Sequence, residues 1–142
     1  MEKEIKQTWQ FNQPAKEVWQ YLTRPELIEQ WLMKSDFRPE VGYKFTFSFT
    51  PKPGSIYDGT VNCEVLEVKP FTRLSYTWNG GLMESDRKFS STIVWTLVPN
   101  GKGTELQLNH GGFTEMEDII AHTSGWKACL QRMEEQINLV KI

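Results

Sequence analysis

The chain has 142 residues, 24% of them charged and 39% hydrophobic, which is typical of a single soluble globular domain rather than a disordered segment. Sixteen Lys and Arg against eighteen Asp and Glu leave a formal net charge of −2, so composition gives no basis for binding nucleic acid. The aromatic content is 13% and includes six Trp, and rings this large must pack in a core or around a cavity.

The sequence shows no signal for export or for membrane insertion. The first residues lack the apolar run of a signal peptide, and no stretch approaches the roughly 18 apolar residues of a spanning helix. Cys63 and Cys129 stand far apart, so we expect two buried free thiols in a reducing, cytoplasmic compartment. His110 and His122 lack metal-ligand spacing, so neither a metal site nor a cofactor is predicted.

The N-terminal part of the chain is predicted to form one strand followed by two short helices. Residues 3–11 place apolar side chains on one parity, which predicts a strand. Asn12 followed by Pro14 is typical of a helix start, and a helix is expected over Pro14–Leu22. The segment Thr23–Glu26 has the spacing of a capping box with a proline in the first turn, so a second short helix is predicted to begin there.

Five further strands are predicted from period-two alternation, at residues 43–49, 57–68, 74–78, 89–98 and 105–110. The alternation slips at Leu66, which predicts a bulge. Asn79-Gly80-Gly81 is expected to break a strand, and a polar loop is expected from there to Lys88. Pro99-Asn100-Gly101 predicts a hairpin turn.

A long amphipathic helix is predicted at the C-terminal end. Thr114 and Glu117 have the spacing of a second capping box. Beyond them, apolar residues recur at three- and four-residue steps from Ile119 to Val140. Gly125 is a candidate break that would divide this segment into a short and a long helix.

The predicted order β-α-α-β-β-β-β-β-α indicates an α+β fold in one domain over residues 1–142. Hairpin-like connections between successive strands favour an antiparallel sheet. The apolar stripe of the last helix needs a partner, and the sheet is the only one large enough. We therefore expect a curved antiparallel sheet wrapped around a long C-terminal helix, with the two short helices closing one end.

Ten segments between residues 10 and 140 stand in the order of a known family, namely Pro14–Thr23, Pro25–Leu27, Trp31-Leu32, Val41-Gly42, Glu64–Pro70, Arg73–Trp78, Val94–Pro99, Gly103–Leu106, Leu108–Phe113 and Gly125-Trp126. Together they resemble the START-like (SRPBCC) superfamily, and within it the homologues of the activator of the heat-shock protein 90 ATPase. The resemblance implies the helix-grip fold and a cavity between sheet and long helix, which many relatives use for hydrophobic ligands. It implies no single activity, since the superfamily includes lipid carriers, cyclases, hormone receptors and chaperone activators.

Ten residues are expected to face inward and line this cavity, seven from strand alternation and three from the apolar faces of the helices. The alternative is that these rings fill the core to normal density. His110 and Tyr76 would be the polar groups that orient a ligand. No inward carboxylate accompanies His110, so we expect a hydrogen-bonded core histidine rather than a catalytic base. The ten are Trp31, Phe47, Val61, Tyr76, Trp78, Ile93, Trp95, His110, Trp126 and Leu130.

Two charged segments have simpler interpretations. Glu84–Asp86 with Arg87 and Lys88 is expected to be a solvated connection, with a cavity lid or a partner surface as alternatives. The acidic residues at 115, 117 and 118 are expected to complement the dipole of the last helix.

The leading functional prediction is non-enzymatic binding of a hydrophobic small molecule or lipid. The first alternative is a protein-interaction domain with a chaperone as its partner, as in the activator family. The second is a cyclase- or hydrolase-like enzyme that uses His110 or Tyr76, although the sequence contains no nucleophile elbow and no phosphate-binding loop. An apolar void would favour ligand binding, and a contiguous exposed apolar patch would favour docking.

Overall fold

The structure, a computed structural model, describes residues 3–83 and 85–139. Its elements are β1 (Lys3–Phe11), α1 (Ala15–Thr23), α2 (Pro25–Trp31), β2 (Lys34–Ser35), β3 (Lys44–Ser48), β4 (Tyr57–Lys69), β5 (Arg73–Leu82), β6 (Ser85–Asn100), β7 (Gly103–Phe113) and α3 (Met116–Ile137).

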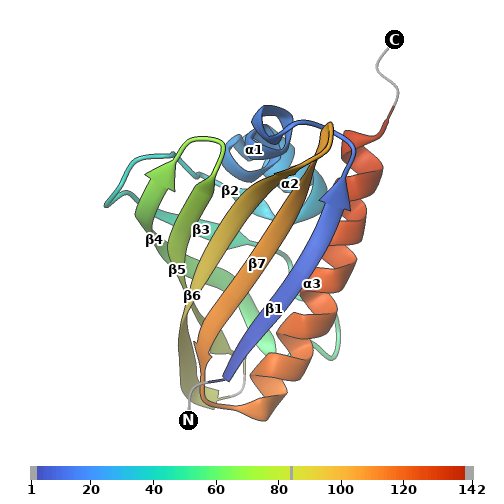
Figure 1. Ribbon diagram of the computed structural model, residues 1–142. Coiled ribbons are helices and arrows are strands. Elements are labelled where there is room, and N and C mark those ends of the chain that lie inside the picture. The colour runs from blue at the N-terminus through green and yellow to red at the C-terminus, as the bar shows by residue number, and fades with distance from the viewer. Residues whose placement is uncertain (1–2, 84, 140–142) are drawn as a thin grey trace.

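All seven strands form one antiparallel sheet in the order β1-β7-β6-β5-β4-β3-β2. The sheet curves around α3, which runs along its inner side, and α1 and α2 cover one end (Figure 1). Strands β5, β6 and β7 are long and pair along most of their length. The predicted helix-grip architecture is therefore confirmed.

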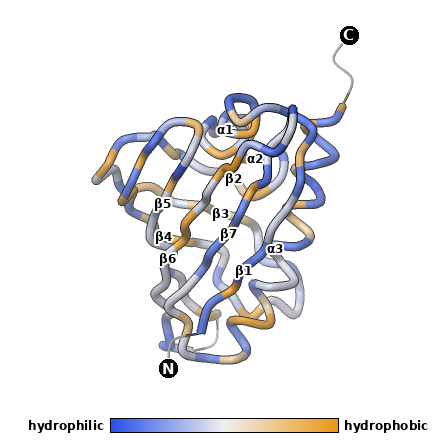
Figure 2. Tube along the Cα trace, viewed as in Figure 1, coloured by the Kyte–Doolittle hydropathy of each residue, from blue (hydrophilic) through white to orange (hydrophobic). Residues whose placement is uncertain are grey.

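The core lies between the inner face of the sheet and α3. On β6, Ile93, Trp95 and Leu97 are buried at alternate positions, which places them on the inner face. Burial of each such side chain contributes about 1.5–3 kcal/mol. Helix α3 adds an inward stripe, and hydrophobic and hydrophilic stretches alternate along its turns (Figure 2). That stripe consists of Trp126, Leu130, Met133 and Ile137.

The prediction of a loop between residues 79 and 88 is wrong for most of these residues, which belong to strands. Strand β5 continues to Leu82 and β6 begins at Ser85, and Leu82 pairs with Ser85. Gly80 pairs with Phe89 across this hairpin, and a Cβ on Gly80 would lie 2.5 Å from the Phe89 ring. The glycine thus permits close approach of a ring instead of ending the strand. Glu84 lies outside the described residues.

The predicted capping boxes are also wrong. The N-cap residues of α1, α2 and α3 are Pro14, Arg24 and Glu115, and none makes a side-chain capping hydrogen bond. The Thr23 hydroxyl instead donates to the Trp19 carbonyl at 2.9 Å, one turn back in α1. Both short helices begin close to the predicted residues, because proline fixes the backbone there without a side-chain cap.

Helix α3 is continuous through Gly125, so the predicted break does not occur. A mid-helix glycine costs about 1 kcal/mol relative to alanine, which the inward stripe of a 22-residue helix offsets. The last buried residue of α3 is Ile137, and Val140, which the sequence pattern places on the same stripe, lies outside the described residues. Within the described ranges, no helix has both the length and the apolarity to cross a membrane.

Three smaller predictions concern a bulge, the two thiols and Phe49. The predicted bulge is confirmed, since the β4–β5 register shifts between Val65 and Glu67. Cys63 is buried as expected, whereas Cys129 is only half-buried. Phe49, expected on an inner strand face, follows the end of β3 and is exposed.

Candidate functional site

A pocket of about 150 Å³ lies between α3 and the inner face of the sheet, and we call it the α3 pocket. Its walls come from α3, from β4, β5 and β6, and from the segments that follow α2 and β3. It reaches the surface beside Phe49 and Gly125, which are both exposed. The described residues that line it are Leu32, Met33, Phe49, Tyr57, Gly59, Thr60, Val61, Trp78, Gly81, Phe89, Ala121, His122, Gly125, Trp126 and Cys129.

The lining of the α3 pocket is almost wholly apolar. Among the described residues that form it, none has a carboxylate, ammonium or guanidinium group. Its polar side chains are two indoles, Tyr57, Thr60, His122 and the Cys129 thiol. Pockets of this composition bind apolar molecules and use a few polar groups for orientation.

Small residues and an unusual backbone make room for the pocket. On α3, Ala121 and Gly125 lie one turn apart and leave space that longer side chains would fill. On β4, Gly59 has φ +94°, and a Cβ there would lie 2.5 Å from the Phe49 carbonyl oxygen. The register of β4 against β5 shifts between Tyr57 and Val61, so the strand is irregular where it borders the pocket.

His110 on β7 is fully buried behind the pocket wall and both of its ring nitrogens are engaged. The Trp126 indole N–H donates to Nδ1 at 2.9 Å, so the ring proton sits on Nε2. Nε2 lies 2.8 Å from the Ser91 hydroxyl, which itself donates to the Trp78 carbonyl at 2.6 Å. Burial, and secondly the neighbouring His122, hold the pKa of His110 well below its ordinary value, so the imidazole is neutral.

His122 on α3 lines the pocket and is engaged in the same way. The Trp78 indole N–H donates to its Nε2 at 3.2 Å, which leaves the proton on Nδ1, 2.8 Å from the Asp118 backbone carbonyl. Burial lowers the pKa of His122, against the effect of the Asp118 contact. Aromatic side chains surround the imidazole, namely Tyr57, Trp78, Phe89 and Phe113.

A buried carboxylate joins three elements at one end of the pocket. Asp118, which is 1% exposed, accepts hydrogen bonds from the Tyr57 hydroxyl at 2.8 Å and from Arg87 at 2.7 Å. Arg87 also pairs with Glu117. Burial alone would raise the pKa of the Asp118 carboxyl, but the bonds from Arg87 and Tyr57 outweigh it and hold the pKa below its usual value. Arg87 therefore ties β6 to α3 and is not part of a purely solvated connection.

Neither imidazole and neither thiol is set up for acid–base or nucleophilic chemistry. The histidines have no ring nitrogen free to accept a proton from a substrate. Burial raises the pKa of Cys63, and it also raises that of Cys129, although Arg132 lies 3.4 Å from the Cys129 sulfur. Within residues 3–83 and 85–139, no group of three or more His, Cys, Asp or Glu side chains could hold a metal ion.

The structure separates the ten candidate cavity residues into two groups. Val61, Trp78 and Trp126 line the α3 pocket. The other seven are buried in the surrounding core, where the Trp95 indole donates to the Tyr76 hydroxyl at 2.9 Å. These seven are Trp31, Phe47, Tyr76, Ile93, Trp95, His110 and Leu130.

Sequence reasoning did not select the residues that leave the space open. The sequence patterns select large inward side chains, whereas the pocket forms where Ala121 and Gly125 carry little or no side chain. The spacing of Ala121, Gly125 and Cys129 is the available signal, because small residues four apart on the apolar side of a helix leave a gap at the sheet. His122 lies on the same side of the helix and was considered only as a metal ligand.

Comparisons with known proteins agree with this architecture. Among solved structures, the chain is similar to protein MLL2253 from Mesorhizobium loti, with 31% identity and a TM-score of 0.86 over 99% of this chain and 100% of that one. It shares the fold of BH1534 from Bacillus halodurans, with 23% identity and a TM-score of 0.72 over 96% of this chain and 97% of that one. CalU16 from Micromonospora echinospora also has 23% identity, with a TM-score of 0.69 over 96% of this chain and 76% of that one.

A search of curated proteins finds no match. The family model of activator of Hsp90 ATPase homolog 1-like proteins matches residues 12–138, which is most of the chain. This match confirms the resemblance seen in the sequence motifs. The chain therefore belongs to the activator of Hsp90 ATPase homolog 1-like family.

Proposed function

We propose that this protein binds a small hydrophobic molecule in the α3 pocket and does not transform it chemically. The observation that carries the proposal is an apolar pocket, without a charged side chain among its described lining residues, that reaches the surface beside Phe49 and Gly125. Burial of apolar ligand surface against such walls contributes about 25 cal/mol per Å². An apolar ligand therefore gains by leaving water for this site.

The state of the polar groups supports binding rather than catalysis. A general base needs a free lone pair within reach of its substrate, and both His110 and His122 use theirs to accept indole N–H groups. Tyr76, considered as a catalytic group from the sequence, lies in the core with its hydroxyl accepting from Trp95. The cyclase- or hydrolase-like alternative thus lacks a group that is ready to act.

The test is a thermal-shift and native mass spectrometry screen of the purified protein against apolar compounds. A ligand that binds only the folded state raises the melting temperature by mass action. We expect at least one uncharged apolar compound to raise it and to appear bound at one copy per chain. Uniform silence across such compounds would refute the proposal and would favour the alternative, in which a surface of this chain docks a protein partner.

Two substitutions on α3 tie any shift to the α3 pocket. At Gly125, a Cβ meets no atom within 4 Å, so Gly125→Leu fits the helix and places its side chain at the pocket opening. Ala128→Leu is the matched control, because Ala128 is exposed on the same helix and does not line the pocket. We expect the ligand shift to disappear only in Gly125→Leu, while both variants fold.

A further inference from the structure

The α3 pocket has properties that restrict what can occupy it, and the restriction depends on the binding function proposed above. We infer that its ligand is an uncharged molecule whose buried part is about the size of one aromatic ring, and that the pocket rejects carboxylates. Fatty acids and aromatic acids are thereby excluded in their ionised forms. Three features of the pocket impose this restriction: its volume, the state of its hydrogen-bond donors and the charge behind its wall.

The volume sets the size of the buried part. The pocket measures about 150 Å³. An apolar protein cavity of about this size holds a benzene molecule. A fused multi-ring compound or a full-length acyl chain exceeds this space and would have to project past Gly125 and Phe49 into water.

Three of the hydrogen-bond donors around the pocket already have partners. Its N–H and O–H groups with fixed partners are the Trp78 indole, the Trp126 indole and the Tyr57 hydroxyl. These donate respectively to His122, His110 and Asp118. A carboxylate in the pocket would find none of the three free, and an ion that loses its water without gaining donors is strongly disfavoured.

The electrostatics act in the same direction. Asp118 lies directly behind the pocket wall, bonded to Tyr57, and its low pKa keeps it negatively charged. Its partner Arg87 offsets that charge but contacts the carboxylate rather than the pocket. His122 carries no positive charge to attract an anion, because its Nε2 accepts the Trp78 N–H. A ligand anion would therefore meet no cation among the described lining residues and an anion behind them. Arg132 lies beside the lining residue Cys129, but its guanidinium donates to the Cys129 sulfur and to the Trp31 carbonyl.

A matched ligand pair tests the charge rule. Benzyl alcohol and benzoate have the same ring, and binding of each is measured by quenching of tryptophan fluorescence at pH 5, 6 and 7. A carboxylic acid with a pKa of about 4 is neutral in about one molecule in 1,000 at pH 7 and about one in ten at pH 5. If only the neutral acid enters, its apparent affinity improves about tenfold for each unit of acidification.

Benzyl alcohol also controls for titration of the protein, because any protein group that affects the site affects both ligands. The titratable and charged groups next to the pocket are Tyr57 and Asp58 from β4, Arg87 and Lys88 from β6, His110 from β7, and Glu117, Asp118, His122, Cys129 and Arg132 from α3. We expect benzyl alcohol to bind with little dependence on pH and benzoate to bind only as the pH falls.

Each other outcome overturns a stated part of the argument. Equal binding of benzoate and benzyl alcohol at pH 7 would overturn the charge rule and leave the proposed binding function intact. Tighter binding of pyrenemethanol than of benzyl alcohol, abolished by Gly125→Leu, would overturn the size limit alone. Failure of every uncharged compound would overturn the binding function and the inference together.

Discussion

Removal of the buried imidazole at position 110 tests the hydrogen-bond network behind the pocket. In His110→Leu a side chain of similar size replaces the ring, so packing is largely preserved. The Trp126 N–H, which donates to His110 at 2.9 Å, then has no acceptor, and Trp126 is only 3% exposed. Ser91 is less affected, since its hydroxyl still donates to the Trp78 carbonyl at 2.6 Å.

The expected loss follows from these contacts. A buried donor without a partner costs about 1–3 kcal/mol. We therefore expect His110→Leu to lower the free energy of unfolding by about 2 kcal/mol, almost all of it through the Trp126 N–H. Trp126→Phe removes that donor as well. The double variant should therefore lose about 1–2 kcal/mol less free energy of unfolding than the two single variants lose together.

Urea unfolding of the wild type, both single variants and the double variant closes the cycle. With a urea dependence of about 2 kcal/mol per molar, a loss of 2 kcal/mol moves the midpoint by about 1 M. Losses that add within about 0.5 kcal/mol would show that the imidazole and the indole do not depend on each other, and the network would be refuted.

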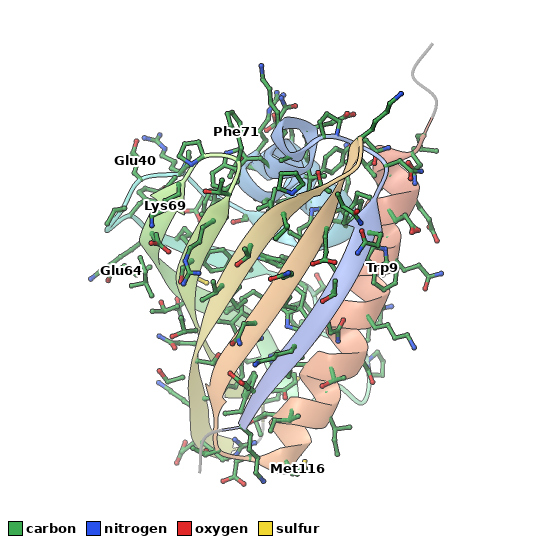
Figure 3. All side chains as sticks on the ribbon, viewed as in Figure 1. Trp9, Glu40, Glu64, Lys69, Phe71 and Met116 are labelled. Carbon is green, nitrogen blue, oxygen red and sulfur yellow. The ribbon has the colours of Figure 1, made fainter. Side chains whose placement is uncertain are left out.

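Three further predictions concern charge and backbone. Because the folded-state pKa values of His110 and His122 lie below the ordinary value of 6.5, their contribution to stability is present above that pH and is lost as the pH falls. The free energy of unfolding, measured in urea at pH 7.5 and 5.5, should fall by up to about 1.4 kcal/mol per imidazole for each pH unit below 6.5, and an unchanged value would contradict the neutral assignment. Asp118→Asn should cost about 1–3 kcal/mol at pH 7, measured by urea unfolding, because it weakens the charge-assisted bond to Arg87; a neutral effect would mean that this bond adds nothing. Phe71, labelled at the end of the molecule near α1 in Figure 3, has φ +68°, so Phe71→Gly should exceed Phe71→Ala in stability by about 1 kcal/mol, and equal melting temperatures would rule out strain there.

The fold could be predicted because its signals are local. Alternation along one strand decides which side chains face inward, and Ile93, Trp95 and Leu97 are buried as that parity requires. The inward stripe of the last helix follows from three- and four-residue spacing in the same way, and Leu130 and Met133 are buried. These patterns depend only on neighbouring residues in the sequence and not on how distant segments pack.

The pocket could be predicted only in part because it depends on relations between distant segments. Strand alternation predicts Val61 and Trp78, and helical spacing predicts Trp126, but neither pattern distinguishes a side chain that borders a void from one that fills the core. The partners of His110 and His122 depend on how α3 rotates against the sheet, which no local pattern encodes. The sequence pattern also predicts that the strand breaks at Gly80, whereas β5 continues through this glycine, which allows the Phe89 ring to pack against it.

The pairing of the first strand with the last has a consequence for how the chain folds during synthesis. Strand β1 (Lys3–Phe11) pairs only with β7 (Gly103–Phe113), about a hundred residues later. At a translation rate of about 5–20 residues per second, β1 waits roughly 5–20 s on the ribosome before its partner is made. The hairpins from β3 to β6 can close in sequence during that time, while the inner side of β1 stays uncovered. The nascent chain is therefore most exposed to aggregation just before β7 and α3 emerge, and a chaperone that shields its N-terminal segment would act in that interval.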